Sequence, residues 1–562
     1  MMYSSSSLFL LLGSVSFVWA ATVEVYWDIT WVNAAPDGYS RPVIGINGAW
    51  PCPLLEANVG DTVIVHVDNK LGNETTGIHF HGINQLGTPE MDGPSSTTQC
   101  SIPPGSSVTY QWLADAPGTY WYHSHQMGQY PDGLRGPMVV HDPQDPYAGK
   151  VDQEVILTCS DWYHSQTIPL VQAMLQPSNT QFRPPLPDSI LVNEGGSTQI
   201  PFDKGKTYRF RMISFSAFGA CLVHFQNHTM QVIMQDGSYV TQAEASQIYL
   251  SPGQRYDVLI SAANTDSSNY PFLFALDVNP DFRAPVLGFP YNKTGYLVTD
   301  PSQNSTSVDV VNVWDPVDSV AFTNPAGEGP LGPVGTSIKL DVTFCFDNNS
   351  IPRSCLNGQP YVPQRVPTLY SAATTGEDNA NPAVYGAVNP FIATGGEIIE
   401  IVLNNLDTGS HPFHLHGHQF QVLAAPASNS GSFSGDTSNF PANPAYKDVF
   451  LVNAKSHAVI RFKADNPGAW LFHCHNEWHV EMGLTATIIE DPPKLRGLTF
   501  PQDHIDVCKA IGQPYQGNAA GNTQDYTDTA GMQFVNPPTY TGALYEPTTV
   551  PRPRSRIVRT KL

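Results

Sequence analysis

Histidine pairs of the form His-x-His are the residues of this chain best suited to chemistry. Eleven of its 18 histidines gather in four short windows, at 79–81, 123–125, 411–418 and 473–479. In a β-strand, residues i and i+2 face the same side, so each pair offers two imidazoles in one direction. Imidazole is a ligand for copper, zinc and iron. The four repeated pairs therefore predict a metal centre rather than ordinary core histidines.

The number of imidazoles indicates more than one metal ion. A zinc ion takes about four ligands, whereas four pairs from two ends of the chain would bring eight nitrogens to one cleft. A set of this size suits several redox-active ions held close together. The eight candidates are His79, His81, His123, His125, His414, His416, His473 and His475.

A cysteine inside the last pair indicates which metal is bound. Cys474 lies between His473 and His475, so on a strand it faces away from both. Its partners would then be the two remaining histidines, His411 and His479. One cysteine with two histidines is the blue-copper arrangement. The His-Cys-His peptide would join this copper to the imidazole cluster. The alternative for Cys474 is a disulfide.

The segments that must position these residues have the pattern of β-strands. Residues 62–67, 398–403 and 459–462 are rich in β-branched residues and flanked by Gly, Asn, Asp or Pro. No long stretch has the 3.6-residue period of a helix. The sequence therefore predicts an all-β fold of consecutive antiparallel sandwiches or barrels.

An internal repeat divides the chain. PGTYWYHSH at 117–125 matches PGAWLFHCH at 467–475, and GDTVIV at 60–65 matches GEIIEI at 396–401. One β-domain therefore lies near each end, with room for a third domain that has no His-x-His pair and serves for spacing and docking. We expect domains at 21–145, 146–325 and 326–495, and a C-terminal tail at 496–562.

Composition and targeting signals describe an exported protein. The chain has 27 basic and 49 acidic residues, and its net charge of −22 disfavours nucleic acid and anionic membranes as partners. Residues 1–20 have the pattern of a signal peptide, and no later apolar run is long enough for a transmembrane anchor. We expect a monomer that is secreted, extracellular or bound to the cell wall. Five glycosylation sequons agree with export: Asn73, Asn227, Asn292, Asn304 and Asn348.

Eight cysteines in an oxidising compartment should mostly pair. If Cys474 binds a metal, at least one more must be free. Cys345 and Cys355 are ten residues apart and suit a local bridge, whereas the sequence leaves Cys52, Cys159 and Cys221 unassigned.

Four motifs resemble the signatures of three-domain multicopper oxidases, which include laccases, ascorbate oxidases and iron-uptake ferroxidases. They are HFHG (79–82), WYHSH (121–125), HPFHLHGH (411–418) and HCHNEWHVEMGL (473–484). The resemblance extends from about residue 22 to 510. It implies three cupredoxin-like Greek-key domains and four copper ions: one type 1, one type 2 and two type 3.

The resemblance also implies a role for each matched residue. His79 and His414 match type 2 ligands, and His411, Cys474 and His479 match type 1 ligands. The type 3 ligands match His81, His123, His125, His416, His473 and His475. Leu484 occupies the axial position of the type 1 site and cannot coordinate, and His418 remains as a structural residue.

Two carboxylates and one disulfide are also implied by the resemblance. Asp92 and Glu477 match family acids near the trinuclear copper site, where they could relay protons to oxygen. Ordinary hydrogen bonding in loops is the alternative for both. Cys100 and Cys508 match a disulfide that ties the tail to the first domain.

The electron donor is less well determined. Segments 402–420 and 461–470 resemble fungal iron-uptake ferroxidases and related pigment laccases. Those ferroxidases bind Fe(II) with several acids and usually end in a membrane span, and this chain departs on both counts. Asp161 stands where the ferroxidases have a glutamate, and it also matches the laccase carboxylate that accepts a proton from phenols. The other acids available for iron are Asp277 and Asp436.

One carboxylate is enough for a phenol, whereas iron needs several oxygen ligands. We therefore expect a laccase-like oxidase that takes single electrons from small phenols and reduces O₂ to water. Its radicals would couple, and the resemblance suggests pigment or polyketide biosynthesis. The alternatives are a ferroxidase that oxidises Fe(II) for iron uptake and a copper-binding protein without catalysis.

Overall fold

The structure is a computed structural model, and it describes residues 20–196, 198–262, 268–277, 292–303, 322–532 and 544–545. The expected signal peptide, apart from Ala20, and the sequon at Asn304 lie outside the described residues.

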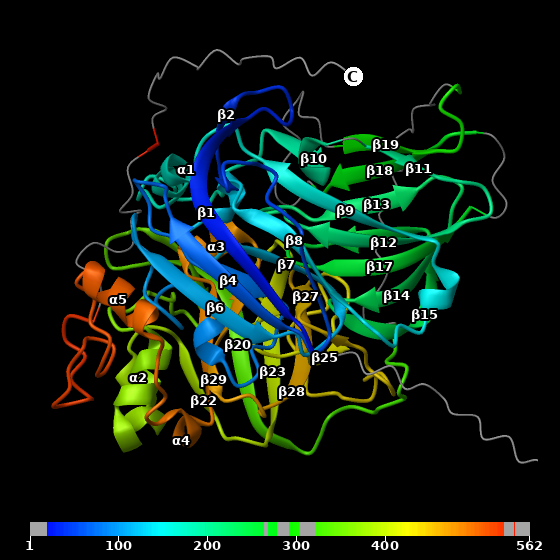
Figure 1. The fold of residues 1–562 in the computed structure, drawn as a ribbon. Coiled ribbons are helices and arrows are strands. Elements are labelled where there is room, and N and C mark those ends of the chain that lie inside the picture. The colour runs from blue at the N-terminus through cyan, green and yellow to red at the C-terminus, as the bar shows by residue number, and fades with distance from the viewer. Residues whose placement is uncertain are drawn as a thin grey trace, which may run out of the picture.

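Six sheets, two for each third of the chain, make up the molecule (Figure 1). The first pair has strand orders β2-β1-β4-β6 and β3-β8-β7-β5, and both sheets contribute to one apolar core. Its strands are β1 (Thr22–Ala34), β2 (Arg41–Ile46), β3 (Leu55–Asn58), β4 (Thr62–Asn69), β5 (Ile78–His81), β6 (Ser107–Leu113), β7 (Gly118–Ser124) and β8 (Arg135–His141).

The middle pair has strand orders β10-β9-β12-β17-β14-β15 and β11-β19-β18-β13-β16 around its own core. Its strands are β9 (Gln153–Trp162), β10 (Ser189–Val192), β11 (Gln199–Pro201), β12 (Thr207–Ser214), β13 (Cys221–Phe225), β14 (Met230–Gln235), β15 (Ser238–Ala245), β16 (Gln247–Leu250), β17 (Arg255–Ser261), β18 (Tyr270–Leu276) and β19 (Asn292–Val298).

The last pair has strand orders β21-β20-β23-β28-β25-β26 and β22-β30-β29-β24-β27 around a third core. Its strands are β20 (Val334–Phe346), β21 (Pro352–Leu356), β22 (Pro390–Ala393), β23 (Ile398–Asn405), β24 (His411–Leu415), β25 (Phe420–Ala424), β26 (Tyr446–Lys447), β27 (Val449–Val452), β28 (His457–Lys463), β29 (Gly468–Cys474) and β30 (Thr485–Glu490).

Helices are short and lie outside the sheets. They are α1 (Thr167–Met174), α2 (Thr368–Thr374), α3 (Glu477–Met482), α4 (Pro492–Leu495) and α5 (Gln502–Ala510). The predicted all-β class is confirmed. The sheets are mixed rather than purely antiparallel, because β1 pairs in parallel with β4, β9 with β12 and β20 with β23. No helix among the described residues is both long and apolar enough to cross a membrane.

The sequence repeat is also a repeat of strand pairing. In the first sandwich β5 pairs antiparallel with β7, which sets His79 opposite His123. In the last sandwich β24 pairs antiparallel with β29, which sets His414 opposite His473. The same strand pair thus carries the histidines in both copies.

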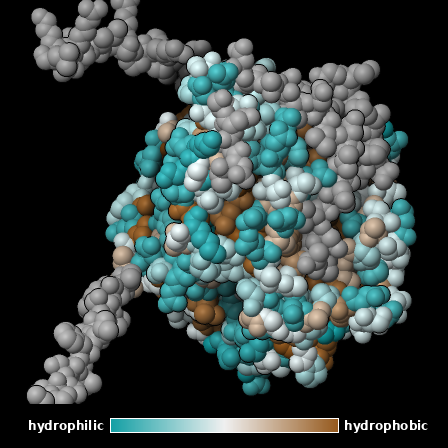
Figure 2. Space-filling model, turned by 90° about the vertical axis from the view of Figure 1, so that its right-hand side faces the viewer, coloured by the Kyte–Doolittle hydropathy of each residue, from teal (hydrophilic) through white to brown (hydrophobic). Residues whose placement is uncertain are grey.

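The tail returns to the first sandwich after the last one ends. Helix α5 lies beside β6, and Thr109 N donates to the Asp503 carboxylate at 2.8 Å (Figure 1). A disulfide between Cys100 and Cys508, which are 408 residues apart in sequence, joins the first sandwich to α5. Among the described residues, hydrophilic ones (teal) are the commonest on the face seen in Figure 2, with smaller apolar areas (brown) between them.

The other cysteines form one bridge in each of the later sandwiches. Cys159 is bonded to Cys221, and Cys345 is bonded to Cys355. Cys474 is free and buried, and so is Cys52, which fills the place of the second unpaired cysteine.

Candidate metal centre

The ends of β5, β7, β24 and β29 bring eight imidazoles from two sandwiches together. One group is His81, His123 and His475, and a second is His125, His416 and His473. In each group the ligand atoms lie within 4.8 Å of one another. Since each group mixes residues of the first and the last sandwich, neither domain holds a complete site alone.

A third group lies next to these two. His79, His81 and His414 also have their ligand atoms within 4.8 Å of one another. The His81 and His414 rings are stacked with their centroids 3.9 Å apart. The two histidines that the sequence assigned to a type 2 copper therefore lie together, one from each terminal sandwich.

Backbone carbonyls orient several of these rings. Nδ1 of His123 bonds to the Ser124 carbonyl at 2.9 Å, and Nδ1 of His473 bonds to the Cys474 carbonyl at 2.8 Å. A proton on Nδ1 leaves the Nε2 lone pair free for a cation.

Ring nitrogens that lack a partner test whether the residues fit copper. The buried Nε2 atoms of His79, His123 and His414 have no hydrogen-bond partner within the described part of the chain. Buried polar atoms are rarely left unpaired without a reason, and a shared metal ion is one. The donor set and its unpaired atoms therefore fit copper.

Protonation states agree with metal binding. Burial, together with the neighbouring rings, holds the pKa of His81, His416 and His475 well below the ordinary value. Burial lowers the pKa of His473 to about 4. The imidazoles are therefore neutral near pH 7, as coordination requires.

A separate group holds the sulfur ligand. The Cys474 Sγ lies 3.7 Å from His411 Nδ1 and 3.6 Å from His479 Nδ1, and the two Nδ1 atoms are 3.1 Å apart. All three residues are fully buried. Burial raises the pKa of the Cys474 thiol, so the thiolate needs a bound cation to persist. This is the His₂Cys set of a blue-copper site.

Leu484, rather than Met482, packs with the sulfur. Leu484 belongs to the apolar cluster that contains Cys474, and its carbonyl accepts the Cys474 N–H at 3.0 Å. Met482 packs in a different cluster with Trp121 and Trp478. The axial assignment of Leu484 remains a prediction, to which this packing gives support.

Asp92 touches histidines of both terminal sandwiches. Its carboxylate Oδ2 lies 2.8 Å from His416 Nδ1, and its backbone carbonyl lies 2.8 Å from His79 Nδ1. Asp92 is completely buried. The carboxylate therefore orients imidazoles across the interface, at a place from which it could also exchange protons.

Glu477 begins helix α3 at the wall of a cavity of about 440 Å³ that also reaches His125. Its Oε1 accepts the Gly128 N–H at 2.9 Å. Burial raises the pKa of Glu477 to about 8. A carboxylic acid that keeps its proton near pH 7 thus lines the same cavity as His125.

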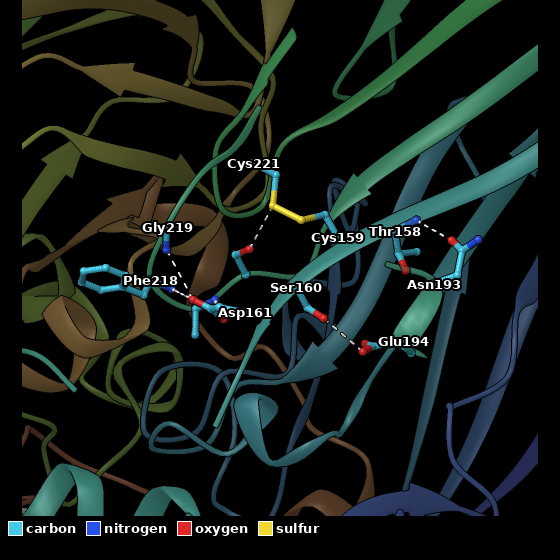
Figure 3. Close-up of a disulfide and its surroundings, with 11 residues drawn as sticks. Thr158, Cys159, Ser160, Asp161, Asn193, Glu194, Phe218, Gly219 and Cys221 are labelled. Atoms are coloured by element: carbon cyan, nitrogen blue, oxygen red, sulfur yellow. Dashed lines mark hydrogen bonds between the residues drawn. A yellow bond between two sulfur atoms is a disulfide. The ribbon is translucent and has the colours of Figure 1, made fainter. Parts of the chain in front are cut away.

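The structure buries Asp161 against a loop of the middle sandwich, and its role as proton acceptor for a phenol stays a prediction. Its carboxylate accepts the backbone N–H groups of Ala217 at 2.8 Å and of Phe218 at 2.6 Å, and Figure 3 shows it turned toward this loop. The side chain has no exposure to solvent, and burial raises its pKa. A group that accepts a proton from a phenol has to be reached by that phenol. In this structure Asp161 holds the 217–219 loop in place.

Sequence reasoning missed an acid at the type 1 group. Asp407 Oδ2 lies 3.2 Å from His411 Nε2, and 18% of the Asp407 side chain is exposed. Burial alone would raise the pKa of Asp407, but the hydrogen bond with His411 lowers it to about 2. The sequence offered one signal for Asp407, its position four residues before His411. In the structure the Asp407 carboxylate also accepts the Gly409 N–H, which closes the turn.

The two other acids considered from sequence, Asp277 and Asp436, differ in their distance from the type 1 group. Asp277 bonds to the Tyr249 hydroxyl in a recess of about 40 Å³, whose wall also includes Ser410 and Pro412 on either side of His411. Asp436 lies in an exposed loop and accepts the Ser438 N–H.

His418 belongs to the frame of the last sandwich. Its Nε2 bonds to the buried Glu490 carboxylate at 2.6 Å. The other Glu490 oxygen accepts the Asn466 N–H. His418 is not one of the grouped ligands.

Comparison with known families and proteins agrees with this geometry. Three family models, each described as multicopper oxidase, match residues 28–145, 153–297 and 361–494. An iron transport multicopper oxidase of Epichloe festucae is 43% identical, over 93% of this chain and 85% of that protein. One of Saccharomyces cerevisiae is 36% identical, over 93% of this chain and 84% of that protein.

Two solved structures are similar to this chain in both fold and sequence. The crystal structure of Fet3p, a multicopper oxidase that functions in iron import, has a TM-score of 0.87 at 34% identity and covers 90% of this chain and 98% of its own. A laccase from Botrytis aclada has a TM-score of 0.77 at 28% identity and covers 88% of this chain and 92% of its own.

Proposed function

The chain belongs to the multicopper oxidase family, and on that premise we propose that its electron donor is Fe(II), which it oxidises to Fe(III). The chain is a copper-dependent oxidoreductase with O₂ as acceptor, and its cofactors are one type 1, one type 2 and two type 3 copper ions. These coppers supply one-electron transfer from the donor and four-electron reduction of O₂ to water.

We assign the ligands by the groups that the fold brings together. His411, Cys474 and His479 hold type 1 copper, and His79 and His414 hold type 2 copper. The type 3 pair is divided between His81, His123 and His475 on one side and His125, His416 and His473 on the other. His473 and His475 flank Cys474 in the chain, so one peptide joins the two kinds of site.

The contact between Asp407 and His411 is the observation on which we base Fe(II) as the donor. A carboxylate with some exposure, held anionic and hydrogen-bonded to a type 1 ligand, is a binding group for a cation at the point of electron entry. It also favours the product over the substrate, because its attraction to a 3+ ion exceeds that to a 2+ ion. Asp277 adds a second carboxylate in the recess beside His411.

One observation weakens the phenol prediction without favouring either donor, and a second favours iron. The carboxylate on which the phenol prediction depended, Asp161, is buried and occupied by backbone N–H groups. The similar proteins from Epichloe festucae and Saccharomyces cerevisiae are both named iron transport oxidases. Our preference for a laccase is therefore reversed in favour of the ferroxidase alternative.

Asp92 and Glu477 are the proposed proton-handling groups. Reduction of one O₂ to two waters consumes four protons, which must reach a buried site. Glu477 holds a proton on its carboxyl at the wall of the cavity that reaches His125, and Asp92 bonds to His416 inside. One acid lines the cavity that reaches the cluster and the other contacts a histidine of the cluster, so both suit proton transfer.

Export remains part of the proposal. The leader pattern at 1–20 and the sequons predict passage through the secretory pathway, where the three disulfides of the described residues can form. We propose that the enzyme works outside the cell or at its surface.

Oxygen uptake by copper-loaded protein tests the donor. We expect kcat/KM to be higher for Fe(II) than for 2,6-dimethoxyphenol, with four Fe(II) consumed for each O₂. Ascorbate-free buffer and a metal-free protein control correct for spontaneous Fe(II) oxidation. A higher kcat/KM for the phenol would contradict the proposal and leave the family assignment intact.

A further inference from the structure

The middle sandwich contributes none of the grouped histidines within the described residues, yet one of its side chains reaches the copper site. Arg255, on β17, is completely buried. Its Nη1 and Nη2 each donate to the Asp448 carboxylate of the last sandwich at 2.6 Å. Its Nε donates to the Thr119 carbonyl of the first sandwich at 3.0 Å. A single guanidinium thus connects all three domains.

Asp448 places this guanidinium one contact away from two candidate ligands. The Asp448 carbonyl lies 2.8 Å from His414 Nδ1, and its carboxylate Oδ1 lies 3.4 Å from His81 Nε2. His81 and His414 come from different sandwiches and belong to the group that also contains His79. The Asp448 residue therefore orients one imidazole with its backbone and faces the other with its carboxylate.

The arginine is itself fixed from behind. Asp236 accepts the Arg255 backbone N–H at 2.8 Å and the Val449 backbone N–H at 3.3 Å. Gly253 adds a carbonyl that accepts from Arg255 Nη1 at 3.1 Å. The Arg255 and Val449 backbone N–H groups are thus both bound to Asp236, and the Gly253 carbonyl accepts from the guanidinium itself. These contacts restrict the orientation of the guanidinium.

Packing around the pair shows how little freedom it has. Gly82 follows His81 directly, and a Cβ on Gly82 would lie 2.5 Å from Arg255 Nη2 and 2.9 Å from Asp448 Oδ2. The ion pair therefore fits against the bare backbone of the segment that carries His81.

We propose that Arg255 is a positioning residue for the type 2 copper site, which acts by fixing Asp448 and, through it, the type 2 ligand His414; the same carboxylate also faces the neighbouring type 3 ligand His81. A planar guanidinium binds a carboxylate with two parallel hydrogen bonds and so fixes its orientation, which a lysine cannot do. The middle domain thereby determines the mutual placement of ligands that it does not itself supply. This role is independent of which donor the enzyme oxidises.

The test compares two buried arginines of the middle sandwich. Arg255→Lys keeps the charge and removes the fork. Arg209→Lys is the matched control, because Arg209 on β12 is also buried and bonds to a buried carboxylate, Asp257, at 2.9 and 2.5 Å. Unlike Asp448, Asp257 bonds to Thr119 and Arg211 and to no grouped histidine among the described residues. For each copper-loaded variant, chelator competition measures copper retention, electron paramagnetic resonance measures the type 2 signal, and the blue absorbance of type 1 copper is the internal reference.

We expect Arg255→Lys to bind type 2 copper about 10–100-fold more weakly and to change the type 2 hyperfine splitting. Its type 1 absorbance should stay that of the unmodified protein, and Arg209→Lys should match the unmodified protein in both signals. An unchanged type 2 signal and affinity in Arg255→Lys would overturn the proposal, and so would an equal loss in Arg209→Lys.

A second pair of variants separates positioning from general stability. Asp448→Asn should weaken type 2 copper by itself, and adding Arg255→Lys to it should cause little further loss, because the arginine acts through the aspartate. Fully additive losses would show that Arg255 acts by another route and would refute the proposal. If Arg255→Lys alone does not fold, Asp448→Asn decides: an unchanged type 2 signal there overturns the inference.

Discussion

Replacing Asp407 by asparagine removes one negative charge from the proposed iron site and keeps the shape of the side chain. A carboxylate and a 2+ ion 4 Å apart attract by about 2 kcal/mol in a water-like dielectric, and by more where solvent is partly excluded. With 18% of the Asp407 side chain exposed, the water-like value is a lower bound. A loss of about 2 kcal/mol corresponds to about a 30-fold fall in affinity. The 3+ product loses about 1 kcal/mol more than the substrate.

The kinetic assay distinguishes this electrostatic effect from damage to the copper site. We expect Asp407→Asn to lower kcat/KM for Fe(II) by at least about 30-fold, mostly through KM. For 2,6-dimethoxyphenol, which has no cationic charge, kcat/KM should change less than about threefold, equivalent to under 1 kcal/mol. Asp436→Asn, in an exposed loop away from His411, is the matched control and should leave both donors unaffected.

Two results would refute the reasoning. An unchanged kcat/KM for Fe(II) would mean that Asp407 does not bind the donor. An equal fall for both donors, with altered type 1 absorbance, would mean that Asp407 acts by holding the His411 ring, to which it is hydrogen-bonded at 3.2 Å.

Three further changes have defined expectations. Gly253→Ala places a methyl group 2.7 Å from Cδ2 of His475 at a φ of +82°, so copper analysis should show fewer than four ions per chain, and full occupancy would contradict the close approach. Burial raises the pKa of Glu74 to about 7. The free energy of unfolding therefore holds the full contribution of the protonated carboxyl below pH 4.5, and it falls by up to about 3 kcal/mol as the pH rises through 7. Unfolding of Glu74→Gln should lack this pH dependence, and the same slope in both proteins would exclude Glu74 as its source. Leu484→Met conserves volume at a cost below about 1.5 kcal/mol and brings a thioether near Cys474. A redox titration should then give a lower type 1 potential, and an unchanged one would mean that residue 484 is not axial.

The ligand groups could be predicted because the signals that define them are local. A His-x-His pair on a strand fixes the direction of both rings, which predicts the imidazole cluster. The division into type 2 and type 3 ligands came from the family resemblance, and the pairing of β5 with β7 and of β24 with β29 came from the structure. The all-β class follows from strand-length apolar runs. Cys474 was placed by its alternation with His473 and His475, which depends only on the period of two.

Residues that act between domains could not be predicted, because no local pattern encodes their partners. Arg255 and Asp448 are 193 residues apart, and each alone reads as an ordinary charged residue near a strand end. Asp161 shows the same limit. Its acidic type was visible in the sequence, whereas its burial against the 217–219 loop was not. Asp407 could not be singled out, because its role depends on its contact with His411 Nε2, which only the folded structure shows.

The mixing of terminal sandwiches within each histidine group has a consequence for biosynthesis. His81 and His475 face each other at 3.2 Å although 394 residues separate them in the chain. At a synthesis rate of roughly 5–20 residues per second, the first imidazole waits about 20–80 s for its counterpart to be made. No copper of the trinuclear site can be held by its full set of ligands during that interval. Metallation therefore has to follow translation and domain docking, and a cell that exports this protein must supply copper downstream of the ribosome.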